Sequence, residues 1–197
     1  MKDVWNSRYS EPDFIYGTEP NTYFKNHIEN SIKGNILLPA DGEGRNSVFA
    51  AKNGWQVDAF DYSRSAQDKA FILAEKHQVS INYVVSDILE YAPNKNYDLI
   101  ALIYLHLIPE DRAQFFKKLS QWLKPDGHIL FEAFAKNQLK NSSGGPKDPK
   151  LLYDLSEIKD DFKDLKIKEI CETEIMLDEG KLHQGKANVI RLIAQKI

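Results

Sequence analysis

Small and acidic residues gather between residues 35 and 63, where the chain could hold a nucleotide. An apolar run at residues 36–38 enters a turn with Ala40, Gly42 and Gly44 at alternate positions, and a helix-like stretch follows. Small residues let a ligand approach the backbone, so this order of strand, turn and helix is typical of a nucleotide-binding βαβ unit. We therefore expect the ligand to lie over this turn.

Asp61 supplies the second part of the pattern. It ends the next apolar run, at the distance downstream where an acid accepts hydrogen bonds from ribose hydroxyls. The turn and the acid together indicate adenosine. A glycine-rich turn alone often marks only a tight loop.

The acidic character of the turn bears on which adenosine cofactor binds. Read as a dinucleotide pattern, residues 42–47 lack the third glycine, and Asp41 and Glu43 would repel a pyrophosphate. S-adenosylmethionine has no phosphate and carries a cationic sulfonium, so an acidic turn favours it. An NAD-linked Rossmann oxidoreductase, which would use the same turn and Asp61, is the alternative.

Length and composition limit the remaining possibilities. With 197 residues and 42% hydrophobic content, the chain predicts a single domain, residues 1–197, without a separate substrate domain. A net charge of −3 without charged blocks disfavours nucleic-acid and membrane partners and favours a small molecule. The start lacks an apolar signal core, which predicts a cytoplasmic protein. The single Cys171 excludes an internal disulfide and is expected to be a buried filler.

Alternating apolar runs and helix-like stretches position these residues. Strands are expected near residues 36–38, 57–61, 81–85, 97–104 and 128–134, with helices at about 18–32, 47–51, 63–77 and 109–123. Two further strands, at residues 165–177 and 186–195, form a terminal hairpin. The prediction is an α/β, doubly wound, mostly parallel seven-stranded sheet with an antiparallel C-terminal hairpin strand, and a ligand beyond the carboxyl ends of its strands.

Two segments lie outside this alternation. Residues 1–33 are predicted to form a strap and a helix, in which residues 5–18 are irregular and aromatic. This strap either packs its rings on the domain or covers the cofactor. Residues 136–150 are polar, contain the sequence SSGGP and are predicted to form a mobile flap over the substrate.

The small-residue turn, Asp61, Asp87 after the third strand and the C-terminal hairpin together resemble class I S-adenosylmethionine-dependent methyltransferases, which are Rossmann-like. The motifs YGTEPN at residues 16–21 and GEGRNS at residues 42–47 resemble the branch that contains the tellurite-resistance (TehB-like) and thiopurine methyltransferases. The resemblance covers most of the chain and implies an enzyme that uses S-adenosyl-L-methionine.

The resemblance also implies a set of cofactor-binding residues: Arg8, Gly17, Ala40, Gly42, Gly44, Asn46, Asp61, Tyr62, Asp87 and Ile88. Asp61 would take the ribose hydroxyls beside Tyr62, and Asp87 the adenine amino group. Arg8 would pair with the methionine carboxylate. The chain departs from the family at Ala40, which replaces a glycine, and at Leu38, where many members carry an acid. Contacts to the cofactor's amino group must therefore come from backbone carbonyls or elsewhere.

Methyl transfer requires few catalytic groups, because the sulfonium already activates the methyl group. Tyr16 and His106 are the candidate catalytic residues, although a lone histidine in an apolar segment is more often structural. Residues 104–109 differ from the Asn/Asp-Pro-Pro-aromatic motif of enzymes that methylate amino groups of bases or glutamine, which favours a small-molecule acceptor. No metal site is expected. A non-catalytic S-adenosylmethionine-binding module is a further alternative.

Overall fold

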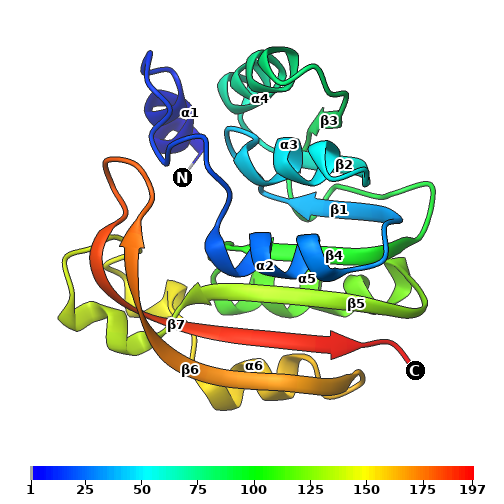
Figure 1. Cartoon of the computed structure of the whole chain (residues 1–197). Helices are drawn as coiled ribbons and strands as arrows, with labels where there is room; N and C mark the ends of the chain where they lie inside the picture. The colour runs from blue at the N-terminus through cyan, green and yellow to red at the C-terminus, as the bar shows by residue number, and fades with distance from the viewer. Residues whose placement is uncertain (1) are drawn as a thin grey trace. The chain divides into compact units, whose positions relative to one another are not determined.

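The computed structural model describes residues 2–197, which form two compact units. The first unit runs to Ala92 and includes residues 179–182; the second holds residues 93–178 and 183–197. Each unit has its own part of the sheet (Figure 1). The prediction of a single domain is not tested by this division and stays a prediction.

The first unit is a βαβαβ arrangement preceded by two helices. Its strands are β1 (Asn35–Pro39), β2 (Gln56–Asp61) and β3 (Asn82–Val85), which pair in parallel. Its helices are α1 (Lys2–Tyr9), α2 (Thr22–Asn30), α3 (Arg45–Lys52) and α4 (Arg64–Lys76). Parallel pairing aligns the carboxyl ends of β1 and β2, so Pro39 lies beside Phe60. The turn after β1 and the acid at the end of β2 are thereby brought to one edge.

The second unit adds one parallel pair and a long hairpin. Its strands are β4 (Tyr97–Ile103), β5 (Leu123–Phe134), β6 (Lys166–Asp178) and β7 (Gln184–Gln195). Its helices are α5 (Pro109–Trp122), α6 (Leu155–Asp161) and the 3₁₀ helices η1 (Lys136–Lys140) and η2 (Pro149–Leu151). β4 and β5 are parallel, whereas β7 is antiparallel to both β5 and β6, as the red and orange strands of Figure 1 show.

The seven strands follow the order β3-β2-β1-β4-β5-β7-β6. A mostly parallel seven-stranded sheet with antiparallel strands at its C-terminal side confirms the predicted α/β, doubly wound fold class. Among the described residues, no helix is long and apolar enough to cross a membrane.

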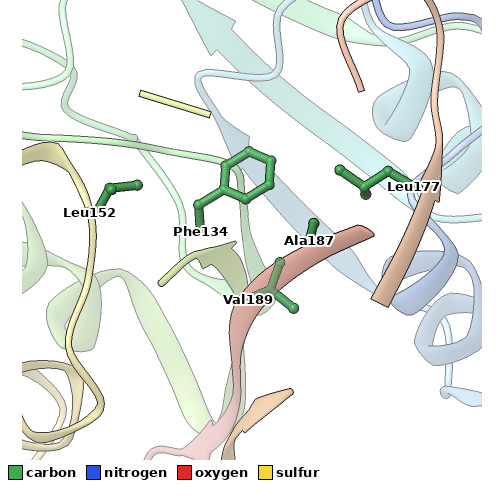
Figure 2. Close-up of a cluster of buried hydrophobic side chains, with 5 residues drawn as sticks. All are labelled: Phe134, Leu152, Leu177, Ala187 and Val189. Atoms are coloured by element: carbon green, nitrogen blue, oxygen red, sulfur yellow. The ribbon is translucent and has the colours of Figure 1, made fainter. Parts of the chain in front are cut away.

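A buried cluster in the second unit explains how its loops are held. Phe134, at the end of β5, packs with Leu152, Leu177, Ala187 and Val189 (Figure 2). In the predicted flap, the Gln138 side-chain amide donates hydrogen bonds at 3.0 Å to the Ser143 hydroxyl and to the Gly144 carbonyl. A Cβ on Gly145 would lie 2.8 Å from the Phe134 ring. The segment is therefore anchored at these points, and its mobility stays a prediction.

The N-terminal segment differs from the sequence prediction. Residues 2–9 form α1 and are not irregular. Trp5 and Tyr9, four residues apart, lie on the same helix face and stack with ring centroids 5.5 Å apart. The next helix begins at Thr22, after Pro20, because the Asn21 side chain caps it by accepting a hydrogen bond from the Phe24 amide at 2.9 Å.

Two further expectations are corrected. β5 begins at Leu123, so residues 124–127, predicted as the turn that ends a helix, already belong to this irregular strand. Cys171 lies on β6 and is only partly buried, since β6 alternates between covered and exposed faces. Ser63, in contrast, is the N-cap of α4 as predicted, and its hydroxyl accepts from the Ala66 amide at 3.2 Å.

Candidate cofactor-binding site

The turn after β1 has an unusual backbone. Ala40, Gly42 and Gly44 all have positive φ angles, of 52°, 62° and 87°. Glycine adopts this conformation freely, whereas Ala40 pays a steric penalty for it. The Asp41 amide donates to the Phe60 carbonyl at 3.2 Å, which pins the turn to the end of β2.

A side chain at Gly42 and a side chain at Gly44 would meet different neighbours. A Cβ on Gly44 would lie 2.6 Å from the Cβ of Ala70 on α4, so this glycine permits close packing between helices. A Cβ on Gly42 would lie 2.8 Å from the Tyr9 hydroxyl. The open side of Gly42 therefore faces the α1 side chains, and Gly44 serves packing within the unit.

Asp61 directly contacts the turn. Its Oδ2 accepts from the Gly42 amide at 3.3 Å, and its Oδ1 accepts from the Ser63 amide at 2.9 Å. Burial raises the pKa of Asp61 to about 6, although these hydrogen bonds oppose the shift. Tyr62, which follows, is partly buried, and burial also raises its pKa. The structure thus brings together the turn and the acid that the sequence singled out.

Asp87 and Ile88 lie after β3, at the same edge of the first unit. The Ser86 amide donates to the Asp61 carbonyl at 3.0 Å, which fixes this loop against β2. Asp87 is oriented by a hydrogen bond of 3.0 Å from the Leu89 amide to its Oδ1. Ile88 is partly buried.

The residues from the N-terminal segment reach the same region. Arg8 donates to the Tyr16 hydroxyl at 3.0 Å and lies over the Trp5 ring at 4.4 Å. Tyr9 is buried, and its pKa is raised by burial and by nearby acidic groups, of which Asp61 is the largest contributor. Arg8 and Tyr16 thus contact each other, and Tyr9 stands among the predicted cofactor residues.

The strap, residues 10–21, is tied to the turn by backbone contacts. The Ile15 amide donates to Glu43 at 2.9 Å, and the Asn21 amide donates to the Asn46 side-chain oxygen at 3.0 Å. The oxygen of Asn46, predicted to face the cofactor, therefore holds the strap.

Glu43 corrects one step of the sequence argument. Its carboxylate lies 2.6 Å from the Lys69 ammonium on α4 and is buried. Because that charge is paired and turned toward the strap, Glu43 would contribute little repulsion to a bound phosphate. Of the two acids in the turn, only Asp41 still supports the argument against a cofactor that carries a pyrophosphate.

Residues 179–182, which connect β6 to β7, belong to the first unit and close against the strap. Glu179 accepts from Arg45 at 2.9 Å, and its other oxygen accepts from the Asn21 side chain at 3.2 Å. A Cβ on Gly180 would lie 2.6 Å from the Gly17 amide nitrogen. Gly17, with a φ of 71°, therefore meets this segment directly.

His106 belongs to the second unit, whereas the other predicted site residues belong to the first. Its Nδ1 is 2.7 Å from the Leu151 carbonyl and so carries the proton, and its ring stacks on Phe134 and Tyr153. Nε2 is buried and has no hydrogen-bond partner among residues 2–197. Burial lowers the pKa of His106 to about 4. This environment is that of a neutral, structural imidazole, and a catalytic role stays a prediction.

The sequence did not predict the part that Tyr9 plays in the site, nor the environments of the two turn acids, Asp41 and Glu43. In the sequence, Tyr9 is one of several aromatic residues near the N-terminus, and no nearby residue indicates that its hydroxyl lies against Gly42. Asp41 and Glu43 stand out in the sequence because they alternate with small residues. Their surroundings could not be predicted, because these are set by residues of other elements.

Residues 36–127 match the family model of a methyltransferase domain. This segment is similar to a methyltransferase domain over slightly less than half of the chain. The match includes the turn, Asp61, Tyr62, Asp87 and Ile88. The residues from the strap lie outside the matched segment.

Two relatives indicate the range of the similarity. Ubiquinone biosynthesis O-methyltransferase of Rickettsia typhi is 32% identical over 114 residues, which are 58% of this chain and 46% of the relative. Thiocyanate methyltransferase 1 of Brassica oleracea is 30% identical over 120 residues, 57% of this chain and 50% of the relative. The chain spans about half the length of the curated relatives it matches.

Solved structures of other proteins share the fold of this chain over nearly its whole length. TehB from Haemophilus influenzae matches with a TM-score of 0.75 at 19% identity, covering all of this chain and 67% of that chain. The N-methyltransferase NodS from Bradyrhizobium japonicum, in complex with S-adenosyl-L-homocysteine, matches with a TM-score of 0.72 at 12% identity, covering 99% and 97%. At these identities the likeness concerns the fold alone.

The residues at this turn have the chemistry to hold S-adenosylmethionine. Gly42 presents backbone without a side chain, with the Tyr9 hydroxyl lying over it, and Asp61 is the acid beside it. The two carboxylate oxygens of Asp41 are buried and have no hydrogen-bond partner among the described residues, which suits a cationic ligand. Within residues 2–197, no group of three or more His, Cys, Asp or Glu side chains could hold a metal ion.

Proposed function

We propose that this protein transfers the methyl group of S-adenosylmethionine to a small-molecule nucleophile by in-line displacement. The observation that carries the proposal is the hydrogen bond from the Gly42 amide to Asp61, inside the segment that matches a methyltransferase domain. It sets a ribose-binding acid beside backbone without side chains, as an adenosine cofactor requires.

The roles proposed for the chain's residues follow from their positions. Asp61 would accept hydrogen bonds from the ribose hydroxyls, with Tyr62 beside the adenine. Asp87 would accept from the adenine amino group, with Ile88 covering the ring. Arg8 would pair with the methionine carboxylate, after exchanging its contact with Tyr16.

S-adenosylmethionine, when bound, supplies a methyl group that is already activated by its sulfonium. The chain then needs to align the nucleophile and exclude water. Trp5, Tyr9 and Tyr16 form an aromatic cover suited to excluding water. Because the Tyr9 hydroxyl lies on the open side of Gly42, we propose that α1 shifts when the cofactor binds.

For the acceptor, we propose a small nucleophile with a sulfur, selenium, tellurium, oxygen or nitrogen atom, and neither nucleic acid nor a membrane component. The motifs at residues 16–21 and 42–47 favour the TehB-like and thiopurine branch. The relatives include an O-methyltransferase and a thiocyanate methyltransferase, so an oxygen acceptor and thiocyanate are both represented. At neutral pH the low pKa of His106 makes it a weak base, which suits an acceptor that is already anionic.

The test begins with calorimetric titration of the protein with S-adenosylmethionine, S-adenosylhomocysteine and NAD. We expect the first two to bind and NAD not to bind. Turnover is then followed as release of S-adenosylhomocysteine with selenite, tellurite, thiocyanate, thiols, thiopurines and phenols. NAD binding without S-adenosylmethionine binding would indicate an oxidoreductase. Cofactor binding without turnover across the panel would indicate a non-catalytic binding module.

A further inference from the structure

A cavity of about 240 Å³ lies in the second unit, where it is lined by residues of α5, η1, η2 and α6. Its walls include three cationic side chains, Arg112, Lys136 and Lys150. Of the described residues that line it, only Glu157 is an acid. The predicted cofactor-binding residues are not part of this lining, so the cavity is a second candidate site of the chain.

Arg112 has most of the unused hydrogen-bonding capacity in this cavity. A guanidinium has five N–H donors, yet within residues 2–197 the Arg112 side chain makes a single hydrogen bond, from Nη1 to Glu157 at 3.4 Å. Oδ2 of Asp161 lies 2.9 Å from Nε, but neither atom has a hydrogen-bond partner among these residues, so the two interact as charges only. Arg112 is 9% exposed, and a buried donor without an acceptor is costly. An oxyanion can accept from two N–H groups of a guanidinium at once.

The two lysines add positive charge to the lining. Lys150, on η2, is exposed, and its ammonium group forms no ion pair within the part of the chain that the structure describes. Lys136 lies 2.8 Å from Glu157 and 4.0 Å from Asp154, so it holds the acid of the lining. Three cations thus outnumber one paired carboxylate, which favours a negatively charged ligand.

The rest of the wall is apolar, and the cavity is small. Pro109, Pro149 and Leu152 line it beside the charged groups. Apolar walls lower the local dielectric constant, which strengthens the attraction between a cation and an anion. Pockets for drug-sized ligands start at roughly 300 Å³, so this cavity suits a smaller molecule.

We propose that this cavity binds the oxyanion group, a carboxylate or a phosphate, of a small molecule whose apolar part lies against the two prolines. Arg112 would hold two oxygens of the group, and Lys150 would supply the second cation, while Lys136 stays with Glu157. Binding here does not require the methyl transfer proposed above, because it uses none of the residues assigned to the cofactor.

Occupancy of the cavity should also change the surroundings of His106. The guanidinium carbon of Arg112 lies 5.5 Å from the centroid of the Tyr153 ring, on which His106 stacks. Lys150 belongs to η2, whose last residue, Leu151, has its carbonyl 2.7 Å from Nδ1 of His106. The ring N–H of His106 therefore gives a signal that reports on the cavity without any measurement of activity.

The test is an NMR titration of the wild-type protein, at constant ionic strength, with butyrate, propyl phosphate, inorganic phosphate and the uncharged butyramide. The signals followed are Nε–H of Arg112 and Nδ1–H of His106. We expect saturable shifts of both signals with at least one of the two organic anions and none with butyramide. Tighter binding of propyl phosphate assigns a phosphate group, and tighter binding of butyrate assigns a carboxylate. Inorganic phosphate that binds more tightly than both would overturn the assignment to an organic molecule.

Three variants locate the binding. Lys150→Gln removes an exposed cation and should weaken binding of the favoured probe by about three- to tenfold. Arg112→Lys keeps the charge but loses the planar fork, and it should weaken binding by at least about tenfold. Lys147→Gln is the matched control, since Lys147 is an exposed lysine of the same segment that is not part of the lining. It should leave the affinity within about twofold.

Two results would overturn the proposal: no saturable shift with any anion, or equal weakening in Lys150→Gln and Lys147→Gln. Because Lys150 is exposed, its variant should fold, and this comparison stands even if Arg112→Lys does not fold. A protein that binds no anion in this cavity could still bind S-adenosylmethionine, so failure here would leave the proposed function intact.

Discussion

The carboxylate of Glu43 accepts a hydrogen bond of 2.9 Å from the Ile15 amide, although 28 positions separate the two residues. The same carboxylate lies 2.6 Å from Lys69, which donates a further bond of 2.6 Å to the Asp13 carbonyl. One buried ion pair therefore joins the turn after β1, helix α4 and the strap. The strap is therefore held in place by Glu43, an acid of the turn itself.

Glu43→Ala should release the strap and destabilise the protein. It removes one partner of a pair in which Lys69 and Glu43 are only 11% and 3% exposed, so we expect a loss of ~3 kcal/mol in the free energy of unfolding. Urea denaturation measures this loss, and hydrogen exchange should accelerate in residues 10–18. The control is Arg64→Ala, which breaks an exposed pair with Asp68 and should cost less than ~0.5 kcal/mol. Equal losses in the two variants would contradict the role of Glu43.

Gly42→Ala should reduce cofactor affinity more than Gly54→Ala does. Both glycines have positive φ, so both changes carry a similar backbone cost of ~1 kcal/mol. Only at Gly42 would the new Cβ meet a neighbour, the Tyr9 hydroxyl at 2.8 Å, whereas nothing lies within 4 Å at Gly54. Calorimetry with S-adenosylmethionine should show a loss of at least about tenfold for Gly42→Ala alone. Gly42→Val should abolish binding.

Asp61→Ala should weaken cofactor binding by more than ~1 kcal/mol, because it removes charge-assisted hydrogen bonds to the ribose. A 2′-deoxy analogue of the cofactor serves as the matched ligand. The variant and the wild-type protein should bind this analogue with more similar affinities than they bind S-adenosylmethionine. An unchanged affinity for S-adenosylmethionine in Asp61→Ala would remove Asp61 from the site.

In the absence of ligand, Asp61 should make the protein less stable as the pH rises. Its pKa is about 6 in the folded state, above the 3.8 of a free aspartate, so the folded protein binds this proton more tightly than the unfolded chain. Stability from Asp61 is therefore lost between about pH 4 and pH 6. The comparison of wild type with Asp61→Asn by thermal denaturation isolates the effect, which should reach ~1 to 3 kcal/mol. A constant difference between the two across this range would contradict it.

His106 should act in the opposite sense. Its folded pKa of about 4 lies below the usual 6.5, so its stabilisation is complete above pH 6.5 and is lost as the pH falls toward 4. The ring proton resonances of His106 in an NMR titration should not shift between pH 8 and pH 5.5. A midpoint near 6.5 would show that the imidazole is solvated, which would reopen a catalytic role.

Elements with local signals were predictable from the sequence. The N-cap at Ser63 and the helix Pro109–Trp122 follow from capping and proline chemistry within a few residues. The alternation of strands and helices fixed the sheet, and with it the meeting of Gly42 and Asp61. These features follow from the local sequence or from the order of strands and helices along the chain.

The parts of the site that escaped prediction depend on contacts between distant positions. α1 has no clear apolar face over its eight residues, and its place is set by packing with α4. Glu43 pairs with Lys69, which is 26 positions away in the sequence. The sequence of the turn alone could therefore not show whether this acid faces a ligand or a lysine. The sequence left two roles open for His106, catalytic or structural, and the stacking and the backbone carbonyl that surround its ring come from residues up to 47 positions away.

The short connection at residues 179–182 limits how this protein can be engineered. Tips of β-hairpins usually tolerate insertions, tags and new chain ends. Here Glu179 holds Arg45 at the start of α3, and Gly180 leaves no space beside the Gly17 backbone. A reporter inserted at this hairpin tip would therefore disturb the start of α3 and the strap, while the exposed residues 147 and 148 offer a safer place.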